Sequence, residues 1–232
     1  MSKKSKYAAQ QRKAEQQKKT ILYCVIAALC VALLIGIIVG VTSCDEGKPD
    51  RSNIVVTYVE ADPDLTYYAD IEIKNYGTIT VLLDQSAAPK TVSNFISLAQ
   101  SGFYDGLTFH RIMEGFMMQG GDPNGDGTGN AGKTVEGEFA ENGFDNPISH
   151  VRGVISMARA KAYNSASCQF FIVHEDSTES LDGKYAAFGH VISGMEVVDE
   201  ICETVPQGYN GATDPDDQPI IKSIKIRTEE KK

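Results

Sequence analysis

Two kinds of apolar pattern occur along this chain of 232 residues. Residues 21–41 read ILYCVIAALCVALLIGIIVGV and contain no charged side chain. At about 1.5 Å per residue, a helix of this length would cover the roughly 30 Å hydrocarbon core of a bilayer. Beyond residue 66 the apolar runs are short and bounded by turn residues, which is typical of strands. The pattern predicts an apolar anchor followed by a compact domain.

The compact part opens with a predicted β-hairpin and a helix. Residues 71–73 and 79–83 alternate apolar and polar side chains around the turn residues 75–77, so one face of the hairpin is expected to be buried. Pro89 suits the first turn of a helix with apolar positions at a spacing of three or four, and Gly102 suits the position after its end.

The remaining apolar runs are short and predict further strands, with a second helix over residues 195–203. The runs are 154–157, 170–173, 186–191 and 220–226. Many short strands with two helices indicate a mainly antiparallel β fold, and closure into a barrel would remove exposed sheet edges.

Charge separates the two ends of the chain. The first twenty residues carry seven Lys or Arg against one Glu, a net charge of +6. The whole chain carries −9, which leaves −15 for residues 21–232. An acidic body argues against nucleic acid as a partner. The basic segment before the apolar run predicts a cytoplasmic N-terminus and a compact domain outside the membrane.

Three interpretations of the apolar segment stay open. An intact single-pass transmembrane anchor over residues 21–41 is favoured. Residues 41–44 (VTSC) resemble a bacterial lipobox, in which Cys44 would be lipid-modified. A cleaved signal peptide is the third, although its apolar core is usually only about 7–15 residues long. All three would export the domain.

The predicted organisation has five parts. A basic cytoplasmic segment (1–20) precedes the membrane anchor (21–41), and a polar linker (42–66) leads to the compact domain (67–228), which a charged tail follows (229–232).

Nothing in the residue pattern predicts a metal site or a cofactor. Cys168 and Cys202 are the cysteines of the compact domain, and no C-x-x-C pair exists. They are interpreted as two small buried hydrophobic residues, although an exported location would permit a disulfide. The four histidines show no pairing that indicates a metal or the base of a nucleophile (His110, His150, His174 and His190).

Two motif matches are dismissed on their context. Residues 127–134 (GTGNAGKT) fit the P-loop pattern, but no apolar strand precedes them and no helical stripe follows, so no nucleotide is expected. The residues from Asp122 open like a calcium-binding loop, but Lys133 stands where a bidentate Glu is required.

Residues 109–122 (FHRIMEGFMMQGGD) carry the most specific signal. An Arg-bearing strand followed by apolar residues before Gly-rich turns is unusual for plain core, and this segment closely resembles the signature of the cyclophilins. Three more blocks resemble the family's in order and spacing: 153–160 (GVISMARA), 167–172 (SCQFFI) and 181–189 (LDGKYAAFG). The resemblance covers residues 67–228 and indicates a membrane-anchored, bacterial-like peptidyl-prolyl cis-trans isomerase.

This resemblance implies a closed eight-stranded antiparallel barrel capped by two helices, with a shallow proline-binding groove on its outside. It implies that Arg111 is the catalytic guanidinium and that Gln119 bonds the substrate backbone or orients Arg111. The other implied substrate contacts are Phe116, Met117, Phe171 and Leu181 in the prolyl pocket, Ala158, Arg159 and Ala160 beside the residue before proline, and Tyr185 as an aromatic wall.

The chain departs from the family pattern at three groove positions. Ser180 stands where the family commonly has Trp, a position that matters more for cyclosporin binding than for isomerisation in the family. Tyr185 replaces the common His of the pocket. Arg159 replaces the usual Asn, so the preference for the residue before proline is expected to differ.

The implied reaction explains why no nucleophile, metal or cofactor is expected. Rotation of an X–Pro bond breaks amide resonance at a barrier of about 18–20 kcal/mol but breaks no covalent bond. In the twisted state the prolyl nitrogen regains a lone pair, so a donor that bonds it lowers the barrier. The permanently protonated fork of Arg111 can supply that donor.

The expected partners are proline-containing polypeptides of exported proteins, reached from a membrane attachment through residues 21–41. A proline-segment binding module or holdase chaperone without essential turnover is the alternative. The presence of Arg111 together with Gln119 favours catalysis.

Overall fold

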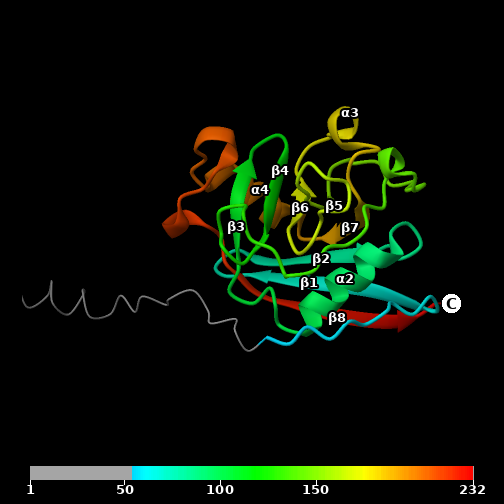
Figure 1. Ribbon diagram of the computed structural model, residues 1–232. Coiled ribbons are helices and arrows are strands. Elements are labelled where there is room, and N and C mark those ends of the chain that lie inside the picture. Colours follow the sequence, from blue (N-terminus) through cyan, green and yellow to red (C-terminus); the bar gives the residue numbers. More distant parts are fainter. Residues whose placement is uncertain (1–53, 232) are drawn as a thin grey trace, which may run out of the picture. The chain divides into compact units, whose positions relative to one another are not determined.

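The computed structural model describes residues 54–231. In this part of the chain, eight strands form one antiparallel sheet in the order β3-β4-β6-β5-β7-β2-β1-β8 (Figure 1). The strands are β1 (Leu65–Ile73), β2 (Gly77–Leu83), β3 (Thr108–Met113), β4 (Met117–Asp122), β5 (Val154–Met157), β6 (Phe170–Val173), β7 (Ala187–Ser193) and β8 (Ile221–Glu230). The helices are α2 (Pro89–Gln100), α3 (Thr178–Leu181) and α4 (Met195–Thr204), with 3₁₀ turns η1 (Ala140–Asn142), η2 (Tyr209–Gly211) and η3 (Pro215–Asp217).

The predicted hairpin and helix are confirmed. β1 pairs with β2 so that Ile71 lies opposite Ile79, and both are fully buried. Asn75 adopts a positive φ of 69° in the turn between the strands, which Asn tolerates better than most residues. Helix α2 begins at Pro89, and Gly102 follows its end with a φ of 71°.

The main core lies between the sheet and α2, and aromatic rings dominate it. Phe95 of α2 is fully buried and meets Phe170 edge-to-face, with ring centroids 5.5 Å apart. The ring of Phe188 also packs against Phe95, with centroids 5.2 Å apart. Truncation of such a buried ring to Ala typically costs about 3–5 kcal/mol of folding free energy. This core fixes the strands whose outer surfaces carry the predicted site.

The expectation of a closed barrel is wrong, because the sheet is an open half-barrel. Its two edge strands, β3 and β8, are not paired as a ladder, and the one isolated bridge between their ends joins Thr108 to Ile220, the residue before β8. Farther along β3 the neighbouring chain is the η2 segment, where Ala212 bridges Arg111. The η2 segment therefore occupies the edge that β8 would need in order to close the ladder.

The expectation of two helices is also wrong, because the sheet is accompanied by three in the described residues. Helix α3 is a single turn of four residues, too short to show an apolar stripe in the sequence. Its only buried side chain is Leu181, which lies at its end. In Figure 1, α3 lies beyond β5 and β6, at the top of the view.

The membrane placement is corrected as well. Within residues 54–231, no helix has both the length and the apolar character that crossing a membrane requires. The predicted anchor (21–41) and Cys44 lie outside the described residues. The expected single-pass anchor is therefore not found in the described part of the chain.

Part of the predicted linker packs onto α2. The N–H of Val59 donates to Oγ of Ser97 at 2.8 Å, and the N–H of Ala61 donates to Oγ of Ser93 at 3.0 Å. The apolar side chain of Val56 also packs against the main core. These contacts hold the chain against the helix before β1 begins.

Candidate functional site

Nine of the ten residues predicted for the site line one groove of about 220 Å³. They are Arg111, Phe116, Met117, Gln119, Ala158, Arg159, Phe171, Leu181 and Tyr185. The tenth, Ala160, lines an adjoining hollow of about 230 Å³, which also includes Gln119, Ala158, Arg159 and Gln169. Residues from strands β3, β4 and β6, helix α3 and the intervening loops thus meet at one place.

The sheet register explains why distant sequence blocks meet. Arg111 of β3 lies opposite Gln119 of β4, and Gln119 lies opposite Phe171 of β6. On β6 the neighbours of Phe171 point into the main core, so alternation along the strand turns Phe171 to the outer face. Register therefore places a cation, an amide and an aromatic ring in one row across three strands.

The apolar wall of the groove is a second hydrophobic cluster, separate from the main core. Its buried members are Met117, Val154, Phe171, Val173, Leu181 and Ala187, and partly buried Phe116, Ala158 and Tyr185 pack against them. The cluster therefore gives the groove one side made of aromatic and aliphatic groups.

The guanidinium of Arg111 is held by three residues on the polar side of the groove. Nε donates to the main-chain oxygen of Asn210 at 2.9 Å, and Nη2 donates to Oδ1 of the same residue at 3.1 Å. Nη2 also contacts Sδ of Met113 at 3.1 Å, and Nη1 donates to Oε1 of Gln119 at 3.3 Å. Of its five N–H groups, one on Nη1 has no partner among the described residues.

Burial at this position lowers the pKa of the Arg111 guanidinium from its usual value. An Arg side chain nevertheless stays protonated in proteins. The site therefore keeps a fixed positive donor beside an apolar wall, where it is less screened by water than on an open surface.

The sequence interpretation missed Asn210, which clamps Arg111. It lies in η2 with a φ of 56°, a left-handed conformation that Asn adopts more readily than most residues. This conformation lets both its main-chain oxygen and its side-chain oxygen face the guanidinium. The Asn-Gly pair at 210–211 marks a turn in the sequence, but only the open edge of β3 shows what the turn contacts.

Gln169 was also missed, and it fixes the orientation of Gln119. Nε2 of Gln169 donates to the main-chain oxygens of Gly127 and Gly129 at 3.1 and 2.9 Å. Its Oε1 is therefore the atom that accepts from Nε2 of Gln119, at 2.9 Å. The remaining oxygen of Gln119 then faces Arg111, so the amide network presents an acceptor to the cation.

The glycine pair after Gln119 is required by close packing. A Cβ on Gly120 would lie 2.8 Å from both the ring of Phe109 and the main-chain oxygen of Thr108. Gly121 has a φ of 81°, which L side chains rarely adopt. The two residues therefore let this part of β4 lie against Phe109 and Thr108 of β3.

Arg159 stiffens the rim of the groove. Its guanidinium carbon lies 4.8 Å from the ring centre of Tyr185 and 4.9 Å from that of Phe139, both distances typical of cation–π contacts. Its Nε donates to the main-chain oxygen of Lys184 at 2.8 Å. Tyr185 in turn meets Phe171 edge-to-face, so Arg159 supports the aromatic wall.

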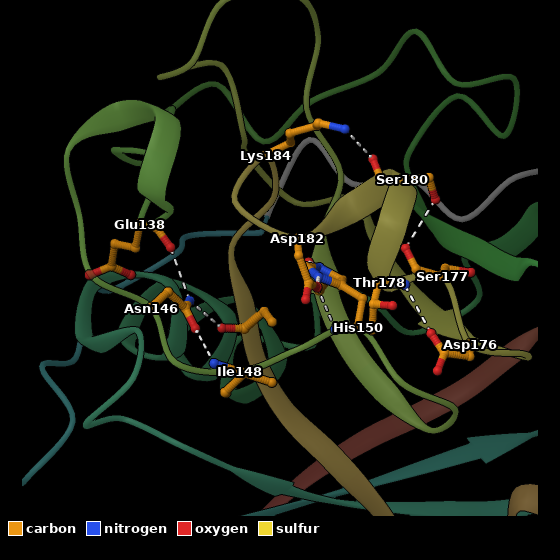
Figure 2. A network of polar contacts seen from close by, with 12 residues as sticks. Glu138, Asn146, Ile148, His150, Asp176, Ser177, Thr178, Ser180, Asp182 and Lys184 are labelled. Atoms are coloured by element: carbon orange, nitrogen blue, oxygen red, sulfur yellow. Dashed lines mark hydrogen bonds and ion pairs between the residues drawn. The ribbon is translucent and has the colours of Figure 1, made fainter.

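The histidine interpretation needs correction, because His150 belongs to a Ser–His–Asp arrangement. Figure 2 shows its contact with Asp182. Nδ1 of His150 lies 2.8 Å from Oδ1 of Asp182, and Nε2 lies 2.9 Å from Oγ of Ser156. Because a carboxylate only accepts, Nδ1 carries the proton and Nε2 accepts from the serine. Ser156 is fully buried, so no substrate reaches it and the arrangement is structural.

This network stands directly behind the apolar wall. The ring of His150 stacks on Phe171 with centroids 6.1 Å apart, and Asp182 follows the groove residue Leu181. Burial lowers the pKa of His150, and this effect outweighs that of Asp182, which raises it. The net shift favours the neutral ring. Burial alone would raise the pKa of Asp182, but hydrogen bonds from His150 make the net shift downward.

Ser180, which stands where the family commonly has Trp, lies exposed on α3. Its Oγ donates to the main-chain oxygen of Ser177 at 3.0 Å, and its own main-chain oxygen accepts from Nζ of Lys184 at 3.0 Å (Figure 2). The side chain does not line the groove of nine residues, so this edge of the pocket is lower than a Trp would make it.

The structure also accounts for the two dismissed motifs. Asp122 is buried, and its carboxylate accepts main-chain N–H groups of Asn124, Asp126 and Gly127, which hold the loop closed. After residues 127–134 the chain forms an isolated bridge from Val135 to Ala166 and no helix. Cys168 and Cys202 are both buried, and neither forms a disulfide within the described residues.

Residues 68–229 match the family described as "Cyclophilin type peptidyl-prolyl cis-trans isomerase/CLD". Among individual relatives, "Peptidyl-prolyl cis-trans isomerase-like 2" of Gibberella zeae is 42% identical over 66% of this chain, which spans only 25% of that protein. "Peptidyl-prolyl cis-trans isomerase B" of Bacillus subtilis is 50% identical over 47% of this chain and 73% of its own length. A "Peptidyl-prolyl cis-trans isomerase" of Helicobacter pylori is 44% identical over 59% of this chain and 80% of its own length.

Solved structures agree with these relatives. A cyclophilin type peptidyl-prolyl cis-trans isomerase of Cryptosporidium parvum superposes with a TM-score of 0.62 at 34% identity, covering 71% of this chain and 99% of that one. A second structure of the same protein, in the presence of the dipeptide Ala-Pro, has a TM-score of 0.61. The chain therefore belongs to the cyclophilin-type peptidyl-prolyl cis-trans isomerases, and it is an isomerase of that type.

Proposed function

We propose that the groove accelerates rotation about X–Pro bonds by a non-covalent mechanism centred on Arg111. The prolyl ring lies against Phe116, Met117, Phe171 and Leu181, and the residue before it lies along Ala158, Arg159 and Ala160. Tyr185 closes the aromatic side of the pocket. The partners are proline-containing polypeptides, and no cofactor takes part.

The single observation that carries this proposal is the geometry of Arg111 at the border between the two sides of the groove. Four hydrogen bonds to Asn210, Met113 and Gln119 fix the guanidinium, and one N–H on Nη1 is free of partners in the described part of the chain. A fixed donor needs little reorganisation when the reaction begins, and such preorganised donors make large contributions to catalysis.

The free N–H bonds the prolyl nitrogen only when the amide has twisted. In the planar ground state the nitrogen lone pair is delocalised, whereas in the twisted state it becomes available as an acceptor. The interaction is therefore stronger in the transition state than in the bound ground state, and this difference raises kcat. The apolar wall holds the ring still while the preceding carbonyl rotates.

The Ala-Pro dipeptide in the Cryptosporidium parvum crystals supports a proline-centred site. By this likeness we propose that a small residue before proline is accepted here, with its main chain along residues 158–160. Gln119 holds Arg111 through its Oε1, and by the same likeness its amide also contacts the substrate backbone.

Exchange spectroscopy on an Ala-Pro peptide tests the proposal. The full-length chain is expected to accelerate cis–trans exchange, and Arg111→Ala is expected to lose most of that acceleration while still binding the peptide. Full retention of exchange in Arg111→Ala would contradict the mechanism. A holdase would instead rescue aggregating clients equally well with and without Arg111.

A further inference from the structure

The β3–β4 turn that presents Phe116 is held from behind by two side chains outside the groove. The N–H of Gly115 donates to Nδ1 of His174 at 2.9 Å. The N–H of Glu114 donates to Oε1 of Gln207 at 3.0 Å. The main-chain N–H of His174 also donates to the oxygen of Phe116 at 2.9 Å. Three hydrogen bonds thus surround the residue whose ring forms one side of the groove.

His174 is itself fixed on its other side. Nε2 of the ring lies 3.2 Å from Oδ1 of Asp199 on α4. Arg152 donates to both oxygens of Asp199 at 2.6 and 2.7 Å, and to the main-chain oxygen of His174 at 2.8 Å. His174 is only 6% exposed, so its ring is not free to turn into water.

This environment determines which nitrogen of His174 accepts. Asp199 offers only acceptor oxygens, so Nε2 carries the proton that points to it. Nδ1 is then left as an acceptor, and the N–H of Gly115 is the donor directed at it. Asp199 of helix α4 thereby fixes the tautomer of His174 that holds the turn.

Packing does not replace these hydrogen bonds at Gly115. The residue is exposed with a φ of 75°, and apart from its two chain neighbours no described residue lies within 4 Å of a Cβ placed on it. The turn is closed locally by the N–H of Phe116, which donates to the oxygen of Met113 at 3.0 Å. The hydrogen bonds from Gly115 to His174 and from Glu114 to Gln207 therefore set the position of the turn relative to the groove.

We propose that His174 is a positioning residue for the isomerase groove, which sets the place of the Phe116 ring by accepting from Gly115 through Nδ1 while Asp199 holds Nε2. His174 touches neither substrate nor Arg111, so it acts on binding of the prolyl ring and not on the twisted bond. This inference rests on the proposed function, because it assumes that Phe116 contacts proline.

Two substitutions separate the two ring nitrogens. In His174→Asn the side-chain oxygen lies near the place of Nδ1 and keeps an acceptor for Gly115, whereas His174→Gln reaches towards Asp199 and leaves Gly115 without one. Loss of one hydrogen bond is worth about 0.5–1.5 kcal/mol, so His174→Gln should raise KM for an Ala-Pro peptide about 3- to 10-fold with kcat unchanged. His174→Asn should stay within about twofold of the parent chain.

His190→Asn provides the matched control, because His190 is exposed on β7 away from the turn. This variant should leave both KM and kcat unchanged. The amide resonance of Gly115 provides a readout that does not need activity: it should move strongly in His174→Gln and much less in His174→Asn.

Two results would overturn the proposal: an unchanged KM in His174→Gln, or equal behaviour of the Asn and Gln variants in both KM and the Gly115 resonance. Absence of exchange activity in the parent chain would instead contradict the proposed function. In that case the Gly115 resonance still decides whether His174 holds the turn.

Discussion

Nε of Arg111 lies 2.9 Å from the main-chain oxygen of Asn210, a residue 99 positions farther along the chain. This contact exists because the sheet stays open between β3 and β8 and the η2 segment lies along the free edge of β3. A closed ladder would place another strand there. The open edge is thus the structural reason that the guanidinium has a clamp.

Removal of the side-chain half of this clamp should slow the reaction. Asn210→Gly keeps the left-handed backbone and the main-chain acceptor but removes Oδ1. One lost hydrogen bond to a charged group should lower kcat about tenfold with little change in KM. Asn210→Asp, which keeps an oxygen at that position, is the control and should remain close to the parent. Equal kcat in the Gly variant would show that Oδ1 does not hold Arg111.

Removal of the ring at position 116 should weaken binding. Phe116→Ala deletes part of the apolar wall that a prolyl ring contacts, which should raise KM about tenfold while kcat falls much less. Steady-state exchange measured over a range of peptide concentrations separates the two constants. Val151→Ala, an exposed residue outside the groove, should change neither constant. A fall in kcat alone in Phe116→Ala would argue against a binding role.

The fold should become less stable as pH falls below about 6.5, because two buried histidines must then take up protons. Burial lowers the pKa of both His110 and His150 below their ordinary value of 6.5. The unfolded chain therefore binds more protons than the folded chain as pH falls below about 6.5, and the free energy of unfolding decreases towards lower pH. Each histidine contributes a slope of at most about 1.4 kcal/mol per pH unit.

His110→Phe tests this pH dependence. Both ring nitrogens of His110 lack a hydrogen-bond partner in the described structure, so an aromatic ring without them loses no contact of that kind. Denaturant unfolding between pH 7 and pH 5 should show a shallower loss of stability in the variant than in the parent chain. Parallel curves would mean that His110 does not titrate in this range.

The sequence indicated which residues line one groove, but it did not indicate the residues that hold them in place. Arg111, Gln119 and Phe171 lie in sequence segments that follow the order of the cyclophilin motifs. Sheet register and strand alternation explain why the three side chains share one face. Helix α2 could be predicted equally well from the sequence, because Pro89 and Gly102 mark its two ends. In these cases local chemistry and tertiary structure agree.

Contacts between residues far apart in the chain could not be predicted from the sequence pattern. Asn210 reads only as a turn residue, and nothing in its neighbours indicates Arg111. The Ser156–His150–Asp182 arrangement joins residues of a loop, a strand and a helix end whose approach depends on the register of the sheet. The open edge likewise depends on where η2 lies, which no periodicity encodes.

The most direct test of the central claim compares Arg111→Ala and Arg111→Lys with the parent chain in cis–trans exchange of an Ala-Pro peptide. Loss of one preorganised donor should lower kcat/KM about 10²–10³-fold in the Ala variant. The Lys variant should remain well below the parent, because an ammonium keeps the charge but cannot hold Asn210 and Gln119 with the same planar fork. Exchange in Arg111→Ala as fast as in the parent would contradict the account.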